Sequence, residues 1–221
     1  YPHFNIQDSS LSWTVNFGAS AFTYTLPTDH LAISAANMFT ATSPAIEDGS
    51  KYFQTTTYSG VAGANKVNQT GNSSFTPDLV WIRRRDGAGD GVMFNSPLTT
   101  SSGEHIRSSS SASSGTESGW ASFDDNGFSF DGADASVEVN TGSRTYVAWQ
   151  WLAGSAPTAT NSAGAGNTPT AGSVKIDGSN LGSALGGSIA ATEISASRVA
   201  GCSIVLYTGN KTAGATVAHG L

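Results

Sequence analysis

Four of the five tryptophans in this 221-residue chain bear on what it could bind. An aromatic ring exposed on a protein surface stacks on the C–H face of a sugar ring, which suits tryptophan to glycan binding. Trp81, Trp149 and Trp151 each lie in an alternating, strand-like pattern. In a chain this poor in Leu and Ile we expect these three in the core, because aromatics bury the most area per residue. Trp120 borders a Ser-rich stretch and is the better candidate for an exposed, ligand-binding ring.

The only run of basic residues is Arg83, Arg84 and Arg85. Guanidinium groups bind phosphate and anionic glycans through charge-assisted hydrogen bonds. Acidic residues flank the run and would compete by forming ion pairs with it: Asp78, Asp86 and Asp90. We favour a solvated strand end, and the three arginines join Trp120 as candidate ligand-binding residues.

Five oxygen-bearing side chains gather in one short segment, as calcium ligands do: Asp124, Asp125, Asn126, Asp131 and Asp134. Calcium takes six to eight oxygen ligands, but the spacing here is not that of an EF-hand loop. Asp and Asn beside Gly are what a tight turn requires. We therefore interpret the segment as a turn, and we predict neither a metal ion nor a cofactor.

No pattern in the sequence selects catalytic residues. The four histidines are far apart, and the chain contains neither a nucleophile elbow nor a phosphate-binding loop. Its single cysteine, Cys202, excludes a disulfide framework within the chain. We predict no catalytic residue and no enzymatic activity.

The composition predicts the fold class. Charged residues make up 12 % of the chain, against about 25 % in typical soluble proteins, while Ser, Thr and Gly supply 83 of the 221 residues. A net charge of −6 with ten Lys and Arg argues against general nucleic-acid binding, and no apolar run is long enough for a membrane-spanning helix. We predict an all-β protein of antiparallel β-sandwich modules, jelly-roll or concanavalin-like, in tandem.

Turn signals between short apolar runs place the strands. Asn126-Gly127, between aromatic runs at 120–123 and 128–130, is the strongest hairpin signal. Further strands are expected at 13–17, 22–26, 53–59, 79–82, 91–94, 144–151, 172–177 and 203–208. The Ser-rich segment 99–119 is expected to be a long surface loop.

An internal similarity suggests a repeated unit. The segment 53–60 resembles 202–209 when Tyr58 is aligned with Tyr207, and Ala-Gly-Ala follows each. We therefore expect a complete β-sandwich module at 51–154, a linker with a short strand at 155–200, and the start of a second copy at 201–221.

Several motifs within 51–154 resemble the repeated β-modules of tail-fibre and adsorption proteins of tailed, often marine, phages. They are Tyr-x-Gly at 58–60, Phe-Thr-Pro-Asp-Leu-Val-Trp-Ile-Arg at 75–83, Phe-Asp-Asp-Asn-Gly-Phe at 123–128 and Thr-Tyr-Val-Ala-Trp-Gln-Trp at 145–151. The family's usual basic-Asn-Arg is replaced here by the three arginines at 83–85. The hairpin at 15–27 is similar to the last hairpin of a SPRY-like β-sandwich, which implies a C-terminal piece of such a domain at 1–33 and a connector at 34–50.

The resemblance implies a non-enzymatic virion structural protein, in a tail fibre or head fibre on the particle exterior, that attaches to a host-surface glycan or receptor. Its expected partners are other copies of itself, as a homotrimer, and other virion proteins, with neither nucleic acid nor membrane insertion. Two alternatives stay open: a fibre-borne polysaccharide depolymerase, and a bacterial secreted adhesin built from the same modules.

Overall fold

The computed structural model describes residues 22, 24–28, 46–99, 102–132 and 137–221. The chain divides into two units, Tyr1–Glu47 and Asp48–Leu221, and nearly all of the described residues belong to the second. The hairpin expected in 13–26 and the connector expected at 34–50 lie largely outside the described residues.

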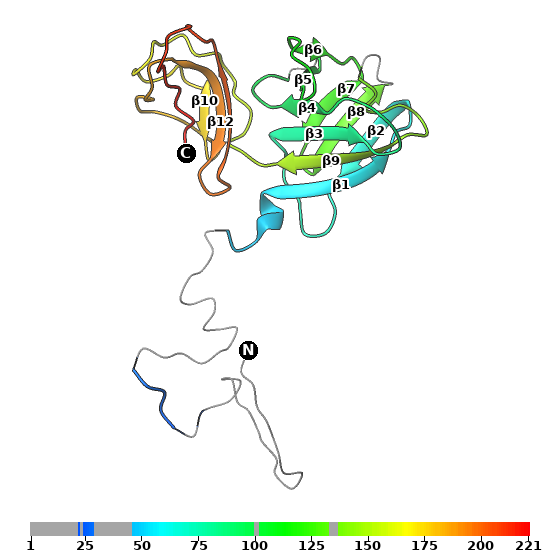
Figure 1. The fold of residues 1–221 in the computed structure, drawn as a ribbon, viewed down its shortest axis with the longest axis horizontal. Helices are drawn as coiled ribbons and strands as arrows, with labels where there is room; N and C mark the ends of the chain where they lie inside the picture. Colours follow the sequence, from blue (N-terminus) through cyan, green and yellow to red (C-terminus); the bar gives the residue numbers. More distant parts are fainter. Residues whose placement is uncertain (1–21, 23, 29–45, 100–101, 133–136) are drawn as a thin grey trace. The chain divides into compact units, whose positions relative to one another are not determined.

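The described part of the chain is all-β, as the composition predicts (Figure 1). Its one helical element is the short 3₁₀ turn η1 (Gly49–Lys51), where the Asp48 carboxylate accepts a hydrogen bond from the backbone N–H of Ser50. Thirteen strands form three sheets.

Two of these sheets form a sandwich-like pair. The larger has six antiparallel strands in the order β1 (Phe53–Ser59), β9 (Thr145–Trp151), β3 (Leu79–Arg84), β4 (Val92–Asn95), β5 (Glu104–Arg107) and β6 (Gly115–Thr116). The smaller has three, in the order β2 (Gly63–Asn68), β8 (Gly127–Gly132) and β7 (Trp120–Asp124). One hydrophobic core draws its residues from both sheets, so the predicted antiparallel β-sandwich is confirmed for this region.

The core is built largely from aromatic rings. Trp120 of β7 stacks on Phe94 of β4, with ring centroids 4.0 Å apart, and lies parallel to Phe128 of β8 at 5.8 Å. Tyr146 of β9 stacks on Tyr58 of β1 at 5.1 Å. Aliphatic residues complete the interior: Val67, Val80, Ile82, Val92, Val137, Val139 and Ala148. Few aliphatic residues are needed because each ring buries a large area.

Strand β9 is present as expected, but the face that points into the core is not the one that carries Trp149 and Trp151. Tyr146, Ala148 and Gln150 are buried, whereas Trp149 and Trp151 alternate with them and are only half-buried. The expectation that Trp81, Trp149 and Trp151 form the core is therefore wrong. The physical reason is space: facing sheets are about 10 Å apart, and the core between them already holds the large rings of Trp120, Phe94 and Phe128.

The Ser-rich segment 99–119 is more ordered than its composition predicts, because it contains β5 and β6. His105 in β5 is 1 % exposed and its ring contacts Phe94 at 5.7 Å, while its neighbour Ile106 is 39 % exposed. The buried anchor of this segment is thus the histidine and not the isoleucine. The contact between His105 and Phe94 anchors the segment to the core, and the high Ser content of the segment does not predict it.

The hairpin between β7 and β8 is confirmed, with Asp124 paired to Gly127 across the turn. Gly127 has φ +121°, and a Cβ there would lie 2.1 Å from the carbonyl oxygen of Val67 in β2. Only glycine meets both requirements, since it tolerates positive φ and lets another backbone approach closely.

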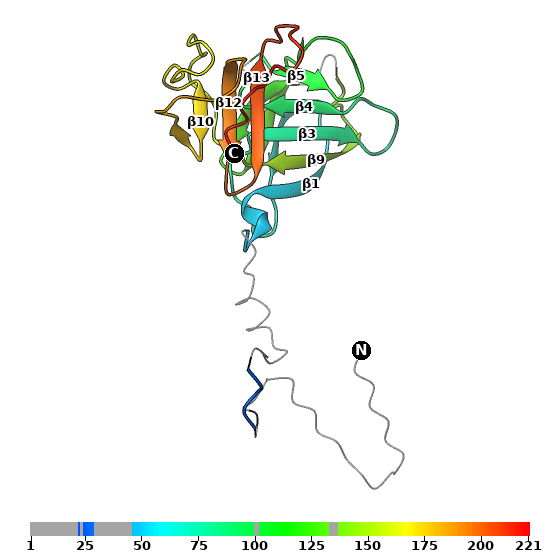
Figure 2. The same ribbon diagram turned by 60° about the vertical axis from the view of Figure 1, so that its left-hand side comes forward.

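A third sheet follows the sandwich, in the order β11 (Ser179–Asn180), β10 (Val174–Ile176), β12 (Ala191–Ser197) and β13 (Cys202–Tyr207). Strand β12 pairs parallel with β10 and antiparallel with β13 (Figure 2). A small core centred on Val174, Ile176 and Ile194 supports this sheet. The segment 155–200, expected to be a linker with one short strand, therefore holds three strands.

Asp78, the residue before β3, joins several backbone segments. It is 3 % exposed, and its carboxylate accepts hydrogen bonds from the backbone N–H groups of Ala153 and Ser155 and from the Ser96 hydroxyl, at 2.6 to 3.2 Å. A buried carboxylate is stable when its lone pairs are satisfied in this way. Asp78 therefore fixes where the chain leaves β9 and is not available to the arginines.

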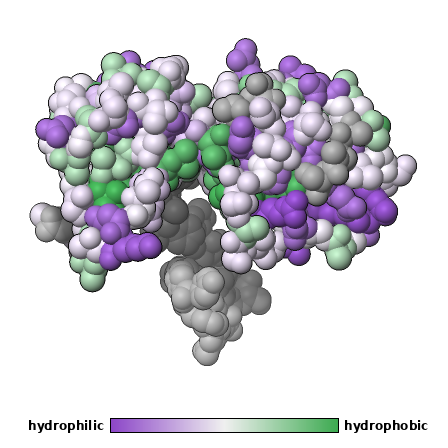
Figure 3. All heavy atoms as spheres, turned by 90° about the horizontal axis from the view of Figure 1, so that it is seen from above, coloured by the Kyte–Doolittle hydropathy of each residue, from purple (hydrophilic) through white to green (hydrophobic). Residues whose placement is uncertain are grey.

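The described surface carries little charge. Much of the face seen in Figure 3 is pale, between the hydrophilic and hydrophobic ends of the scale, as expected for a chain rich in Ser, Thr and Gly.

No helix among the described residues has the length and apolar character needed to cross a membrane.

Candidate functional site

The outer face of the six-stranded sheet, the side turned away from the core, carries Trp81, Trp149 and Trp151. The strand register sets its side chains in three rows across the sheet. Residues paired across neighbouring strands point to the same side. The first row is Phe53, Trp151, Leu79 and Asn95; the second is Thr55, Trp149, Trp81, Met93 and Ile106; the third is Thr57, Val147 and Arg83.

Two aromatic pairs lie on this face, one in the middle row and one in the first row. The Trp81 and Trp149 rings are 5.3 Å apart and tilted by 48°, and the Phe53 and Trp151 rings are 5.1 Å apart and tilted by 52°. The three tryptophans are half-buried and Phe53 is 41 % exposed. Exposed threonines of β1, Thr55 and Thr57, border the rings. The face thus combines aromatic surface with hydroxyl groups.

The indole of Trp81 lies close to the backbone at Gly91. Its indole Nε1 is buried and has no hydrogen-bond partner among the described residues. A Cβ on Gly91 would lie 2.6 Å from that nitrogen and 2.3 Å from the Ser108 hydroxyl. Glycine at 91 therefore lets the polar edge of the indole pack onto the neighbouring loop.

The structure separates the three candidate arginines. Arg84 forms ion pairs with Asp86 at 2.7 Å and with Glu138 at 3.2 Å. The hydrogen bond between Arg84 and Asp86 raises the pKa of Arg84 and lowers the pKa of Asp86. Arg83 and Arg85 are exposed, and neither takes part in an ion pair within the described ranges. Of the flanking acids considered from sequence, only Asp86 pairs with this run, since Asp90 pairs with Arg107.

Trp120, the candidate for an exposed ring, is 2 % exposed. Its ring stacks on Phe94 and lies parallel to Phe128, and so little of the side chain is exposed that no ring face is open to a sugar. The expectation of an exposed Trp120 is wrong because the ring packs against Phe94 of the facing sheet, a contact that the sequence around Trp120 does not reveal. The residue borders a surface hollow of about 600 Å³ that Phe123, Leu152, Thr76 and Ser155 also line.

The acidic segment at the β7–β8 turn is held by local contacts. Asp124 pairs with Lys66 at 3.5 Å and accepts hydrogen bonds from the Ser122 and Ser129 hydroxyls. Asp134 lies outside the described residues. Within the described ranges, no group of three or more His, Cys, Asp or Glu side chains is arranged to hold a metal ion.

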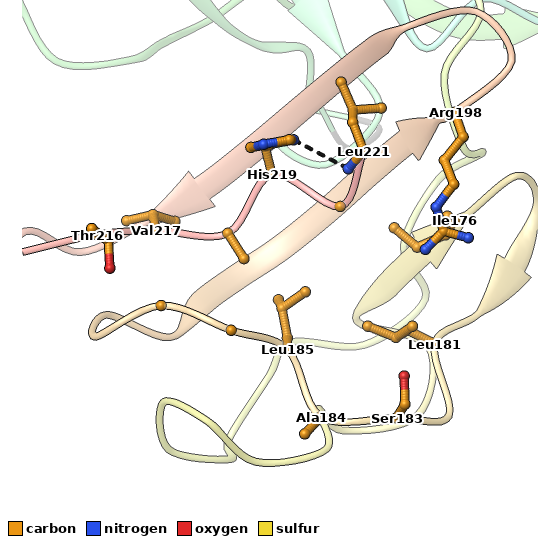
Figure 4. Close-up of a pocket in the computed structure, with 14 residues that line it drawn as sticks. Ile176, Leu181, Ser183, Ala184, Leu185, Arg198, Thr216, Val217, His219 and Leu221 are labelled. Carbon is orange, nitrogen blue, oxygen red and sulfur yellow. Dashed lines mark hydrogen bonds between the residues drawn. The ribbon is translucent and has the colours of Figure 1, made fainter.

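A second hollow, of about 410 Å³, lies beside the third sheet (Figure 4). Leu181 and Leu185 point into it from one side, and Val217 lies on the other. These three side chains also pack against the small core of that sheet. Arg198 at its edge forms an ion pair with Asp177 at 4.0 Å. The hollow is therefore next to the small core, and polar side chains also line it: Ser183, Thr216 and His219.

Cys202, at the start of β13, is a poor nucleophile. Burial raises the pKa of its thiol, and the negative charge of Asp78 adds to the effect. The reactive form of cysteine is the thiolate, and a raised pKa leaves less of it at neutral pH. The thiol of Cys202 is thus suited to packing.

Sequence reasoning missed Phe53 and the threonines as members of the site. They lie in a Thr-rich strand that carries no strong apolar pattern of its own. The available signal was the alternation Phe53, Thr55, Thr57, which places a ring and two hydroxyls on one side of β1. Reading it required knowing that β1 pairs with β9.

Comparison with known proteins identifies one family. A family model described as a domain of unknown function, DUF7483, matches residues 48–177. That range spans the whole sandwich and ends with β10. No curated protein and no solved structure matches the chain.

Proposed function

The chain belongs to the DUF7483 family, whose function is unknown, and we propose that it is a non-enzymatic structural protein of a phage fibre or spike that attaches to glycans of the host surface. Its place is the exterior of the virion, in a tail fibre or head fibre. The observation that carries the proposal is the outer face of the six-stranded sheet, with its tilted tryptophan pair bordered by threonines.

The chemistry of this face suits a sugar chain. Pyranose rings present a C–H face that packs on an aromatic ring, while their hydroxyls need hydrogen-bonding partners around it. Three tryptophans and a phenylalanine supply the aromatic surface, and Thr55 and Thr57 supply hydrogen-bonding hydroxyls. A sheet face is also open and rather flat, so it accepts a segment within a long polymer as well as a chain end.

Repetition along a fibre would compensate for weak binding at one face. A single shallow aromatic surface excludes little water, and area alone does not set affinity. Several linked copies raise the effective concentration at the second contact, so that avidity exceeds the affinity of one face by about 10²–10⁴. A multimeric fibre facing a dense glycan layer meets this condition.

The proposal is tested by locating the protein and by asking whether it cuts glycans. Antibodies against the chain, gold-labelled, are expected to decorate fibres on purified virions. The purified chain is expected to retain capsular polysaccharide without releasing new reducing ends. Labelling absent from virions, together with an export signal on the full-length protein, would instead favour a secreted bacterial adhesin, and released oligosaccharides would favour a depolymerase.

Assembly with other copies of itself and with other virion proteins is part of the proposal. Strand β13 is the last strand of its sheet and pairs only with β12 among the described residues. Its side chains are half-buried apart from Tyr207, which is 55 % exposed. An open strand edge carrying apolar side chains favours pairing with another chain.

We therefore predict that residues 1–221 form a homotrimer or aggregate through residues 172–221. Sedimentation equilibrium measures the association, and removal of 172–221 is expected to reduce it without unfolding 51–154. A soluble monomer with one cooperative melting transition would contradict this prediction.

A further inference from the structure

We propose that the glycan bound on the outer face is acidic, and that Arg83 binds its carboxylate or sulfate group. This inference rests on the proposed function, because it names the class of polymer that the same face takes. It follows from where the register places Arg83 and from the charges around it.

Arg83 lies on the outer face beside the tryptophan pair. It follows Trp81 by two residues on β3, so both side chains point to the same side of the sheet, and it is paired with Val147 of β9. Two residues of a strand span about 7 Å. A sugar ring stacked on Trp81 would therefore hold a substituent within reach of the long Arg83 side chain.

The charge of Arg83 is free to meet a ligand. Its neighbour Arg84 is neutralised by Asp86 and Glu138, but no ion pair of the described residues involves Arg83. None of the twelve side chains in the three rows is a carboxylate. The acids closest to Arg83 along the chain and the register are Asp86 and Asp90, and each forms an ion pair with another arginine, Asp86 with Arg84 and Asp90 with Arg107.

This placement is informative because the chain as a whole repels anions. Its net charge is −6, and only ten of its residues are Lys or Arg. A neutral sugar polymer would need no cation on the face. An exposed guanidinium beside the rings provides paired donors of fixed geometry for a carboxylate or sulfate. The face thus selects acidic over neutral sugars.

The test compares acidic polysaccharides with uncharged counterparts of the same backbone. Polygalacturonate, alginate and chondroitin sulfate are the acidic probes, and carboxyl-reduced polygalacturonate and dextran are the neutral ones. Binding of the full chain is measured by calorimetry at low and at high salt. At least one acidic polymer is expected to bind about 10-fold or more tightly than the neutral ones, and salt should reduce that preference.

Two variants with the same change in charge separate a local contact from the overall field. Arg83→Gln is expected to abolish the preference for the acidic polymer while leaving neutral binding unchanged. Lys66→Gln removes one positive charge from β2, in the other sheet, and should keep the preference. Circular dichroism and melting should be unchanged in both, since Arg83 is exposed and the Lys66 side chain is 61 % exposed.

The outcomes distinguish this inference from the proposed function. Binding of neutral polymers alone, lost in Trp149→Ala, would overturn the acidic preference and leave glycan attachment standing. A preference that survives in Arg83→Gln, or is lost equally in Lys66→Gln, would overturn the role of Arg83. Binding to neither class of polymer would overturn both.

Discussion

Trp120→Ala is expected to lower the free energy of unfolding of the sandwich by about 3–5 kcal/mol, the usual cost of deleting a buried Trp. The side chain is 2 % exposed and packs against the Phe94 and Phe128 rings. Its removal leaves a cavity among aromatic rings of both sheets, which cannot close without moving the strands. Urea unfolding followed by circular dichroism measures the loss.

The matched control for this prediction is Trp149→Ala, which deletes the same side chain from the outer face. It should cost about 1–2 kcal/mol, because it removes one cross-strand aromatic pair and half-buried area but leaves no internal cavity. A Trp120→Ala cost below about 1 kcal/mol would show that Trp120 is not part of the core, and an equally large cost for both variants would show that Trp149 is buried as well.

The second large effect concerns binding. The double variant Trp81→Ala, Trp149→Ala is expected to weaken retention on host-cell polysaccharide by about 10-fold or more, the size expected when central aromatic contacts are deleted. Both rings belong to the middle row of the outer face. Retention is measured by affinity electrophoresis of the full chain in gels that contain the polysaccharide.

Stability must be checked separately in this variant. The double substitution should remain folded by circular dichroism and keep a cooperative melt, because both residues lie outside the core. Thr192→Ala, in the third sheet, is the control and should retain full binding. A folded double variant that binds like the unsubstituted chain would place the glycan contact elsewhere.

Much of the fold could be predicted from short-range signals. Asn126-Gly127 between aromatic runs marked the β7–β8 hairpin, and the dense apolar run at Leu79–Ile82 marked β3, which pairs on both sides. Strands β9, β10 and β13 were also expected. In each case the local pattern determines that a strand forms, so no knowledge of distant partners is needed.

Which face of a strand is buried could not be predicted in the same way. In β9 both faces carry aromatic residues, so alternation alone does not choose between Tyr146 and Trp149. The choice depends on the facing sheet, where Trp120 and Phe128 already occupy the interior. The candidate site was missed for this reason, since residues assigned to the core turned out to form the outer face.

The small-residue segments were the other source of error. Strand β12 reads Ala-Thr-Glu-Ile-Ser-Ala-Ser and carries almost no β-sheet signal. It is a strand because β10 and β13 pair with its two edges, and this long-range pairing cannot be read from its composition.

The arginine run was only partly predictable. The pairing of Arg84 with Asp86 follows from proximity in sequence, whereas the free charge of Arg83 depends on the sheet register.

The central claim is that the outer face of the six-stranded sheet contacts glycans of the host surface. Hydroxyl-radical footprinting of the full chain, free and bound to host-cell polysaccharide, measures the oxidation of each tryptophan separately. Oxidation of Trp81, Trp149 and Trp151 is expected to slow on binding, while Trp120, buried in both states, serves as the internal reference. Unchanged oxidation of these three tryptophans in the bound chain would contradict the claim.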